Sequence, residues 1–222
     1  KKRQYLLQYP LVEELKRVCR KVSTMQESTY YYWQDDPIDE QIWYFNFLQE
    51  MDLILCHNEP DLKYYRGITG KRCELMRTLM IEDKITPHIV NPDARDGVII
   101  GGNFVSAYGG FDSYVVAQEF DEEYGVQLGT AAAGTFNLNC AYHGIPCIGY
   151  NNVDTQRLCH PNLSVDVGDI ETARKLAYQL KEVDEFYKEC SQLTIRKYKE
   201  CFDEKVYIYT MKKVIQKVMS ND

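Results

Sequence analysis

The order of apolar and polar positions along the chain predicts helices that alternate with strands. Pro10 suits a first helical turn, and apolar residues then recur on one helical stripe at Leu11, Leu15, Val18, Cys19 and Val22. A short strand is expected over residues 22–25, and a second helix over residues 38–51. The apolar run at residues 53–56 has the density of a parallel strand that is covered on both faces.

Polar residues interrupt this pattern at two places. Residues 57–61, which begin with His57, are interpreted as the loop at the carboxyl end of the apolar strand. Residues 85–96 carry Pro87 and Pro92 among polar residues, which is typical of a linker. We therefore expect domains over residues 1–88 and 89–204. The remaining residues, 205–222, are expected to form a helix that packs back on the first domain.

Strand and helix patterns resume after the linker. Strands are expected at residues 98–104, where the run ends in glycines, and at 125–128 and 163–167; residues 114–117 start a helix or form another strand. Asp169 can cap a helix whose buried face holds Ile170, Ala173, Leu176, Ala177 and Leu180. Two more helices should run from about residue 183 to the end. The alternation indicates an α/β protein with parallel sheets.

Residues 128–149 carry the most informative pattern. They predict a strand, a glycine-bearing turn, a helix over residues 135–143 that Gly144 ends, and a new strand opened by Pro146, which together form a βαβ unit. The small-residue turn leaves backbone N–H groups near Gly134 open to a phosphate, where the helix dipole adds favourable charge. The turn fits a diphosphate cradle, and it equally fits a tight turn whose alanines pack a helix on the sheet.

Length, composition and charge disfavour membrane-spanning, disulfide-rich and nucleic-acid-binding proteins. The chain has 222 residues, of which 45% are hydrophobic and 27% charged, so it can bury one or two cores. No apolar run approaches the ~20 residues that span a bilayer, and we expect a cytoplasmic protein. Eight cysteines without Cys-x-x-Cys spacing predict reduced thiols packed in a core. A net charge of -7 disfavours nucleic-acid binding except through a local basic patch.

The order of these elements resembles the GT-B glycosyltransferases of the retaining, nucleotide-sugar-dependent kind. Gly144, Pro146 and the strand after them look like that family's Gly-x-Pro strand entry, and Gly134 falls where the family has a glycine that contacts the donor diphosphate. The resemblance implies two Rossmann-like parallel-sheet domains that face each other across a cleft, the first of them incomplete. It also implies an enzyme, a sugar transferase that requires no metal or other cofactor.

The chain departs from this family at several positions. Ala131 and Asn139 stand where the family often has two glutamates, and the loop after the first strand of the donor domain lacks the usual Arg and Lys. The acceptor domain lacks its first strands, and residues 120–123 join two elements where a further strand and helix would intervene. Either the sequence omits residues at both places or the chain is a reduced form of the fold; we favour the omission, because a parallel sheet without a crossover would expose apolar edges.

The resemblance implies a donor site in the second domain. Its members would be the residues around the predicted cradle and in the loop after the following strand: Asn103, Gly134, Thr135, Asn139, Thr155, Gln156 and Arg157. Arg157 replaces the missing cations because its planar guanidinium suits a phosphate. Residues 154–157 can also be read as a polar helix start at the surface.

The expected acceptor site lies at the carboxyl ends of strands in the first domain, where open α/β sheets bind ligands. Glu27 is the candidate that orients the acceptor, with Gln26 beside it, and His57 and Glu59 are alternatives. A metal cluster at residues 57–61 is disfavoured because its spacing is not that of common zinc sites. The aromatic residues at 30–33 and 43–47 are expected to pack in a core or a dimer contact, and they could also stack on a sugar ring.

Three hypotheses about function follow. The first is a glycosyltransferase that moves a sugar from a nucleotide-diphosphate donor to a carbohydrate or other acceptor hydroxyl, with retention. The second is a sugar transferase that acts on modified DNA bases, which the acidic balance disfavours. The third is a catalytically silent GT-B-like subunit that serves in binding or assembly, which the missing glutamates suggest. A homo-oligomer is compatible with each of them.

Overall fold

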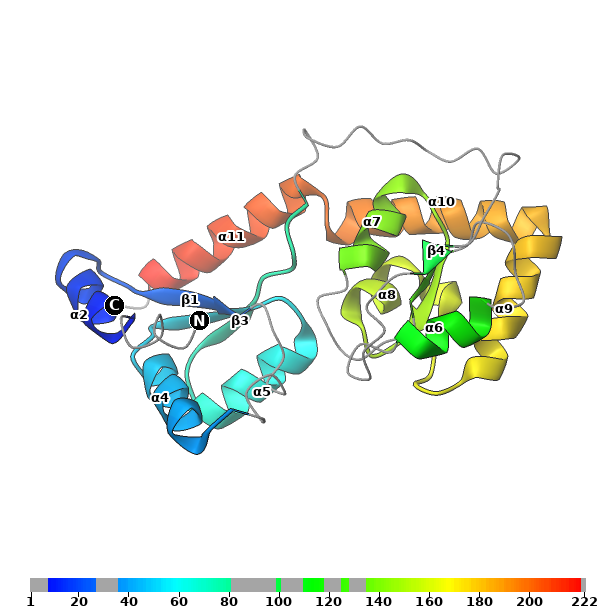
Figure 1. Cartoon of the computed structure of the whole chain (residues 1–222). Helices are drawn as coiled ribbons and strands as arrows, with labels where there is room; N and C mark the ends of the chain where they lie inside the picture. The colour runs from blue at the N-terminus through cyan, green and yellow to red at the C-terminus, as the bar shows by residue number, and fades with distance from the viewer. Residues whose placement is uncertain are drawn as a thin grey trace. The chain divides into compact units, whose positions relative to one another are not determined.

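The chain forms two compact units, and each contains a parallel sheet (Figure 1). The computed structural model describes residues 8–26, 36–80, 99–100, 110–117, 125–127 and 135–220. Unit 1 comprises Lys1–Arg77 and Tyr207–Asp222, and unit 2 comprises Thr78–Val206. The boundary therefore falls at Arg77, whereas the expected linker at residues 85–96 lies outside the described residues.

The sheet of unit 1 has three parallel strands in the order β1 (Ser23–Gln26), β2 (Leu53–Cys56) and β3 (Cys73–Leu75). All four residues of β2 are buried, which confirms the prediction of a strand covered on both faces. β1 lies within one residue of its predicted position. The sequence pattern did not identify β3, which has only three residues.

Helices cover both faces of this sheet. On one face, Ile54 and Cys56 join a core cluster with residues from α2 (Gln8–Val18), α4 (Ile38–Gln49) and α5 (Glu59–Thr69). On the other face, Leu53 and Leu55 contact Val214 and Val218 of α11 (Glu204–Met219). Successive residues of a strand point to opposite faces, so the apolar run of β2 serves both clusters.

Two details of unit 1 differ from the prediction. The predicted stripe of α2 was only partly right: Leu15 and Val22 pack in the core, but so does Val12, while Leu11 and Val18 are exposed and the helix ends at Val18. The core contacts fix the inward face through Val12 and Leu15, which are three residues apart. The loop predicted for residues 57–61 was also wrong beyond its second residue. There α5 begins, because the Asn58 side chain caps it by accepting a hydrogen bond from the Asp61 N–H at 2.8 Å.

The sheet of unit 2 has four parallel strands in the order β4 (Ile99–Ile100), β5 (Gly125–Gln127), β6 (Cys147–Tyr150) and β7 (Ser164–Val165). Helix α7 (Thr135–His143) connects β5 to β6, which are parallel neighbours. The predicted βαβ unit is therefore confirmed with its helix bounds.

Further helices surround this sheet: α6 (Gly110–Ala117), α8 (Asp154–Cys159), α9 (Ile170–Glu182) and α10 (Asp184–Cys201). The Asp169 side chain caps α9 by accepting from the Thr172 N–H at 3.0 Å, as predicted. The buried face of α9 packs in the main core of the unit through Ala173, Ala177 and Leu180. Among the described residues, no helix has the length and hydropathy to cross a membrane.

All eight cysteines are free thiols, as predicted from their spacing. Six of them are buried, while Cys19 is exposed and Cys201 is half-buried. Burial disfavours the thiolate and raises the pKa of Cys56 and of Cys190 to about 12. These thiols therefore pack as small apolar groups at neutral pH.

A test of this packing uses two glycines of unit 2. Gly144 has φ 71°, and a Cβ there would lie 2.8 Å from Ile195 Cδ1 in α10; Gly168 has φ 86°, but a Cβ there would meet nothing within 4 Å. Both alanine variants strain the backbone by about 1–2 kcal/mol. Gly144→Ala should cost about 1 kcal/mol more, because the Ile195 side chain and the Ser191 hydroxyl must shift to make room for the new methyl group. Urea unfolding of both variants measures the difference, and equal losses would contradict the close approach.

Candidate functional site

The residues predicted for the acceptor side lie at the carboxyl edge of the unit 1 sheet. Gln26 is the last residue of β1, and His57 follows β2 directly. Gln26 pairs with Cys56, the residue before His57, so Gln26 and His57 lie at the ends of neighbouring strands. Glu27 lies outside the described residues, and Glu59 is in the first turn of α5.

Hydrogen bonds hold both side chains at this edge. Gln26 is buried; its Oε1 accepts from the Tyr44 hydroxyl, and its Nε2 donates to Thr24 Oγ1 at 3.2 Å. His57 is half-buried, with Nδ1 2.9 Å from the carbonyl oxygen of Met76. A carbonyl only accepts, so neutral His57 carries its proton on Nδ1 and keeps the lone pair of Nε2 as an acceptor.

A small hollow lies beside these residues, between α4 and α5. Its volume is about 220 Å³, and it is lined by Gln41, Tyr44, Phe45, Leu48, Tyr64, Tyr65 and Ile68. Tyr44 thus links the hollow to Gln26. Tyr44 and Phe47 of α4 pack against the core, as expected, and Trp43 stacks on Phe47 with ring centroids 5.7 Å apart, but Phe45 is exposed. The aromatic run at residues 30–33 lies outside the described residues.

In unit 2 the predicted donor site centres on α7. Thr135 is its first residue and is exposed, and Asn139 is exposed one turn later. Gly134 and Asn103 lie outside the described residues. Because α7 follows β5 in a parallel βαβ unit, its N-terminus lies at the carboxyl edge of the sheet, and its first N–H groups have no partner within the helix.

Polar side chains follow the neighbouring strands at the same edge. The Tyr150 hydroxyl, at the end of β6, donates to Asp112 Oδ2 of α6 at 2.8 Å. The next residue, Asn151, donates to Asp166, which follows β7. Burial and the neighbouring Asp112 raise the pKa of Tyr150 to about 12, so its hydroxyl stays protonated. This edge therefore presents amide, hydroxyl and carboxylate groups.

A buried polar network ties α7 to α8, β6 and α10. Asn137 Nδ2 donates to Gln156 Oε1 at 2.5 Å, and Gln156 Nε2 donates to the carbonyl oxygens of Cys147 and Leu163 at 2.7 and 3.1 Å. His160 Nε2 donates to the Asn137 carbonyl oxygen at 3.0 Å. Its Nδ1 lies 2.9 Å from Thr194 Oγ1, which donates to it. The network fixes the position of α7 against the sheet.

This network decides which predicted residues of α8 can reach a ligand. Gln156 is fully buried and its amide is used internally, and Thr155 is also buried. Arg157 is exposed; its guanidinium lies 3.1 Å from Asp154 Oδ1 in the same helix. The sequence showed a polar segment, but three of its four side chains are buried, those of Asp154, Thr155 and Gln156. Gln156 is held by the carbonyl groups of Cys147 in β6 and of Leu163, which the segment alone does not reveal.

Asn137, His160 and Tyr150 were not identified from the sequence, and Tyr44 was considered only as an aromatic for packing or sugar stacking. Each bonds a residue at least 18 positions away, so no local pattern could have shown the pairing. Among the described residues, no group of three His, Cys, Asp or Glu side chains could hold a metal ion. Asp61, in the cluster considered above, instead accepts from the Asn58 amide at 2.7 Å.

Comparisons with known proteins address the fold. No protein-family model matches the sequence, and no curated protein sequence matches it. Among solved structures, sucrose-phosphate synthase from Thermosynechococcus elongatus matches with a TM-score of 0.65 over 90% of this chain and 68% of that chain, at 9% sequence identity. That protein is a GT-B glycosyltransferase. The chain has a GT-B-like α/β fold.

The buried histidine gives a pH test of unit 2. Burial disfavours the imidazolium and lowers the pKa of His160 to about 4 from an ordinary 6.5. Between these values the unfolded chain binds a proton that the folded chain does not. The free energy of unfolding is therefore highest above pH 6.5. It falls as the pH falls toward 4, and at pH 5 the loss caused by His160 is about 2 kcal/mol. Urea unfolding at pH 7 and pH 5 measures it.

The matched variants are His160→Gln and His143→Gln. The first removes the buried imidazole, so its unfolding free energy should change less between pH 7 and pH 5 than that of the parent chain. The second replaces a half-buried histidine and should keep the parent's pH dependence. An unchanged dependence in His160→Gln would show that another group causes it.

Proposed function

We propose that this chain is a glycosyltransferase that moves a sugar from a nucleotide-diphosphate donor to an acceptor hydroxyl, with retention of configuration. The observation that carries the proposal is the fold match to a sucrose-phosphate synthase over 90% of the chain. The exposed N-terminus of α7 at the carboxyl edge of a parallel sheet supports it, because such edges bind ligands in open α/β folds. A cleft between two Rossmann-like domains is part of the proposal.

In this proposal the donor diphosphate binds at the start of α7. The N–H groups of Gly134 and Thr135 donate to phosphate oxygens, and the helix dipole favours the phosphate charge. Arg157 adds a guanidinium that neutralises the charge growing on the leaving diphosphate. Asn139 hydrogen-bonds a ribose hydroxyl. Thr155 and Gln156 act indirectly, by holding α8 and α7 in place.

The acceptor binds at the carboxyl edge of the unit 1 sheet. His57 Nε2 accepts a hydrogen bond from the acceptor hydroxyl and orients its oxygen toward the anomeric carbon of the donor sugar. Gln26 is buried next to His57, and its hydrogen bonds to Tyr44 and Thr24 hold it in place at the base of this site. Glu27 follows in the chain and contributes the carboxylate. Transfer forms the bond from acceptor oxygen to sugar and breaks the bond from sugar to diphosphate.

A second candidate is a silent GT-B-like subunit that binds a nucleotide sugar or a partner without catalysis. It is favoured by Asn139, an exposed amide on α7 at the position where the related family often has a glutamate. Release of free sugar from a nucleotide sugar separates the two functions. Turnover supports the enzyme, while saturable binding without turnover, with or without candidate acceptors, supports the subunit.

The donor site is tested by thermal shift with UDP-, GDP-, ADP- and CMP-sugars. At about 100 times Kd, a ligand specific for the folded state stabilises by about 2.7 kcal/mol, which raises Tm by roughly 5–10 °C. We expect this for one nucleotide class. Arg157→Ala should weaken binding about tenfold or more by removing a charge-assisted hydrogen bond.

The matched control is Arg196→Ala, which removes an exposed arginine from α10 in the same unit. It should leave the nucleotide-dependent shift unchanged. Equal shifts in the two variants would remove Arg157 from the site. No shift with any nucleotide sugar, in protein with a cooperative melt, would argue against the donor site altogether.

A further inference from the structure

Helix α11 presents an outward face with an unusual composition. Its inward face is settled by packing: Val214 and Val218 are buried in unit 1, with Tyr207 and Met211 beside them. About a quarter turn around the helix from that inward face lie three exposed aliphatic residues, Ile208, Ile215 and Met219, which are 37–53% exposed. They are seven and four residues apart, so they lie in one row along the helix.

The rest of the outward face is basic. Lys205, Lys212 and Lys213 are exposed there, and Tyr209 lies among them with Lys213 Nζ 4.4 Å from its ring centroid. Lys217 is exposed too, but its ammonium pairs with Glu74 of the sheet. Within α11 the only acidic residue is Glu204, so four lysines against one glutamate leave a local charge of +3. The whole chain carries -7. The helix therefore differs in sign from the average surface.

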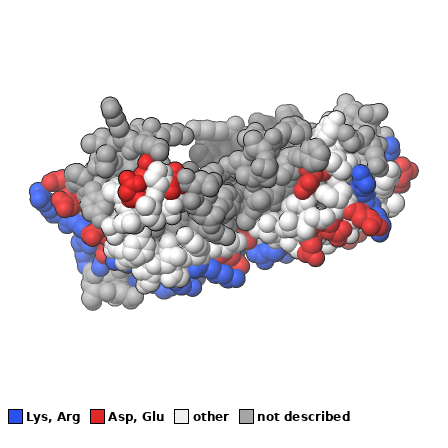
Figure 2. All heavy atoms as spheres, turned by 60° about the horizontal axis from the view of Figure 1, so that its bottom comes forward, with Lys and Arg blue, Asp and Glu red and all other residues white. Residues whose placement is uncertain are grey.

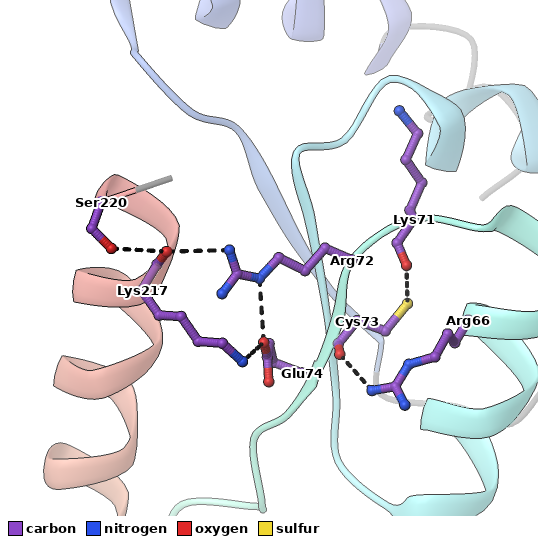
Figure 3. A network of polar contacts seen from close by, with 7 residues as sticks. All are labelled: Arg66, Lys71, Arg72, Cys73, Glu74, Lys217 and Ser220. Carbon is purple, nitrogen blue, oxygen red and sulfur yellow. Dashed lines mark hydrogen bonds and ion pairs between the residues drawn. The ribbon is translucent and has the colours of Figure 1, made fainter. Parts of the chain in front are cut away.

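Ion pairs and hydrogen bonds hold the end of α11 rigidly against the sheet (Figure 3). Lys217 Nζ lies 2.7 Å from Glu74 Oε1 of β3, and the Lys217 carbonyl oxygen accepts from Arg72 at 3.2 Å. Glu74 also accepts from Arg72 Nε at 3.2 Å, and these cations lower the pKa of Glu74 although its burial raises it. The outward face is thus presented on a fixed helix and needs no refolding to bind.

On the face drawn in Figure 2, the described surface of each unit carries both Lys or Arg and Asp or Glu side chains, with uncharged surface between them. The outward face of α11 has a different makeup, a row of aliphatic side chains with lysines beside it and no carboxylate among its exposed residues. Phosphate groups complement the lysines, and an acyl boundary accommodates the aliphatic row.

We propose that the outward face of α11 docks the protein on an anionic membrane surface. The aliphatic side chains insert at the boundary between headgroups and acyl chains, while the lysines contact anionic headgroups. A nucleic acid would use the lysines but would leave Ile208, Ile215 and Met219 in contact with water. The proposal is independent of the glycosyltransferase function, because it uses no residue of the donor or acceptor site.

The test is co-sedimentation of the full chain with vesicles of phosphatidylcholine alone and with 30% phosphatidylserine. We expect binding to the anionic vesicles only, and weaker binding as NaCl rises from 0.1 to 0.5 M. The double variant Lys212→Glu and Lys213→Glu should lower the partition coefficient about tenfold or more. Ile215→Ser should lower it about tenfold, since an exposed aliphatic side chain no longer inserts.

The control is Lys175→Glu with Lys199→Glu, which makes the same charge change on exposed lysines of α9 and α10. It should lower binding far less than the α11 variant. Equal losses would reduce the effect to net charge and overturn the proposal. Retention by duplex DNA without vesicle binding, or self-association that Ile215→Ser abolishes without vesicle binding, would also overturn it. Circular dichroism melts establish that each variant is folded.

Discussion

The arrangement of unit 2 depends on keeping one imidazole uncharged in a place that water does not reach. His160 joins α7 and α10 through its two ring nitrogens, one donating and one accepting, and this pattern exists only in the neutral ring. The Gln156 amide continues the connection to β6. These buried hydrogen bonds fix α7, so they, and not surface contacts, set the position of its first turn at the edge of the sheet.

The same arrangement distinguishes the residues that hold the candidate donor site together from the residue that can touch a ligand. Residues 155 and 156 are polar but lie inside, where the Gln156 amide satisfies two carbonyl groups that would otherwise be costly to bury. Arg157, one residue further along the helix, is at the surface. Of three consecutive polar residues, the first two are therefore buried and the third faces solvent. The helical rotation of 100° per residue explains how neighbours differ so sharply.

Much of the fold was predictable because its signals are local. The Gly144 helix end, the Asp169 cap and the uninterrupted apolar β2 each depend on a few adjacent residues. Errors arose where tertiary contacts choose among local options. In α2, either Val12 or Leu11 could have faced the core of unit 1, and packing against the sheet places Val12 there. In the candidate site, strand ends were predictable, whereas partners such as Tyr44 for Gln26 come from remote segments.

The helix that covers the second face of the unit 1 sheet comes from the end of the chain. Leu53, Leu55 and Met76 meet Val214 and Val218 only after the whole of unit 2, Thr78–Val206, has been made. During synthesis on the ribosome, unit 2 can close its core while one side of unit 1 is still bare. During this time that apolar sheet face is a target for chaperones or for aggregation, until α11 emerges and covers it.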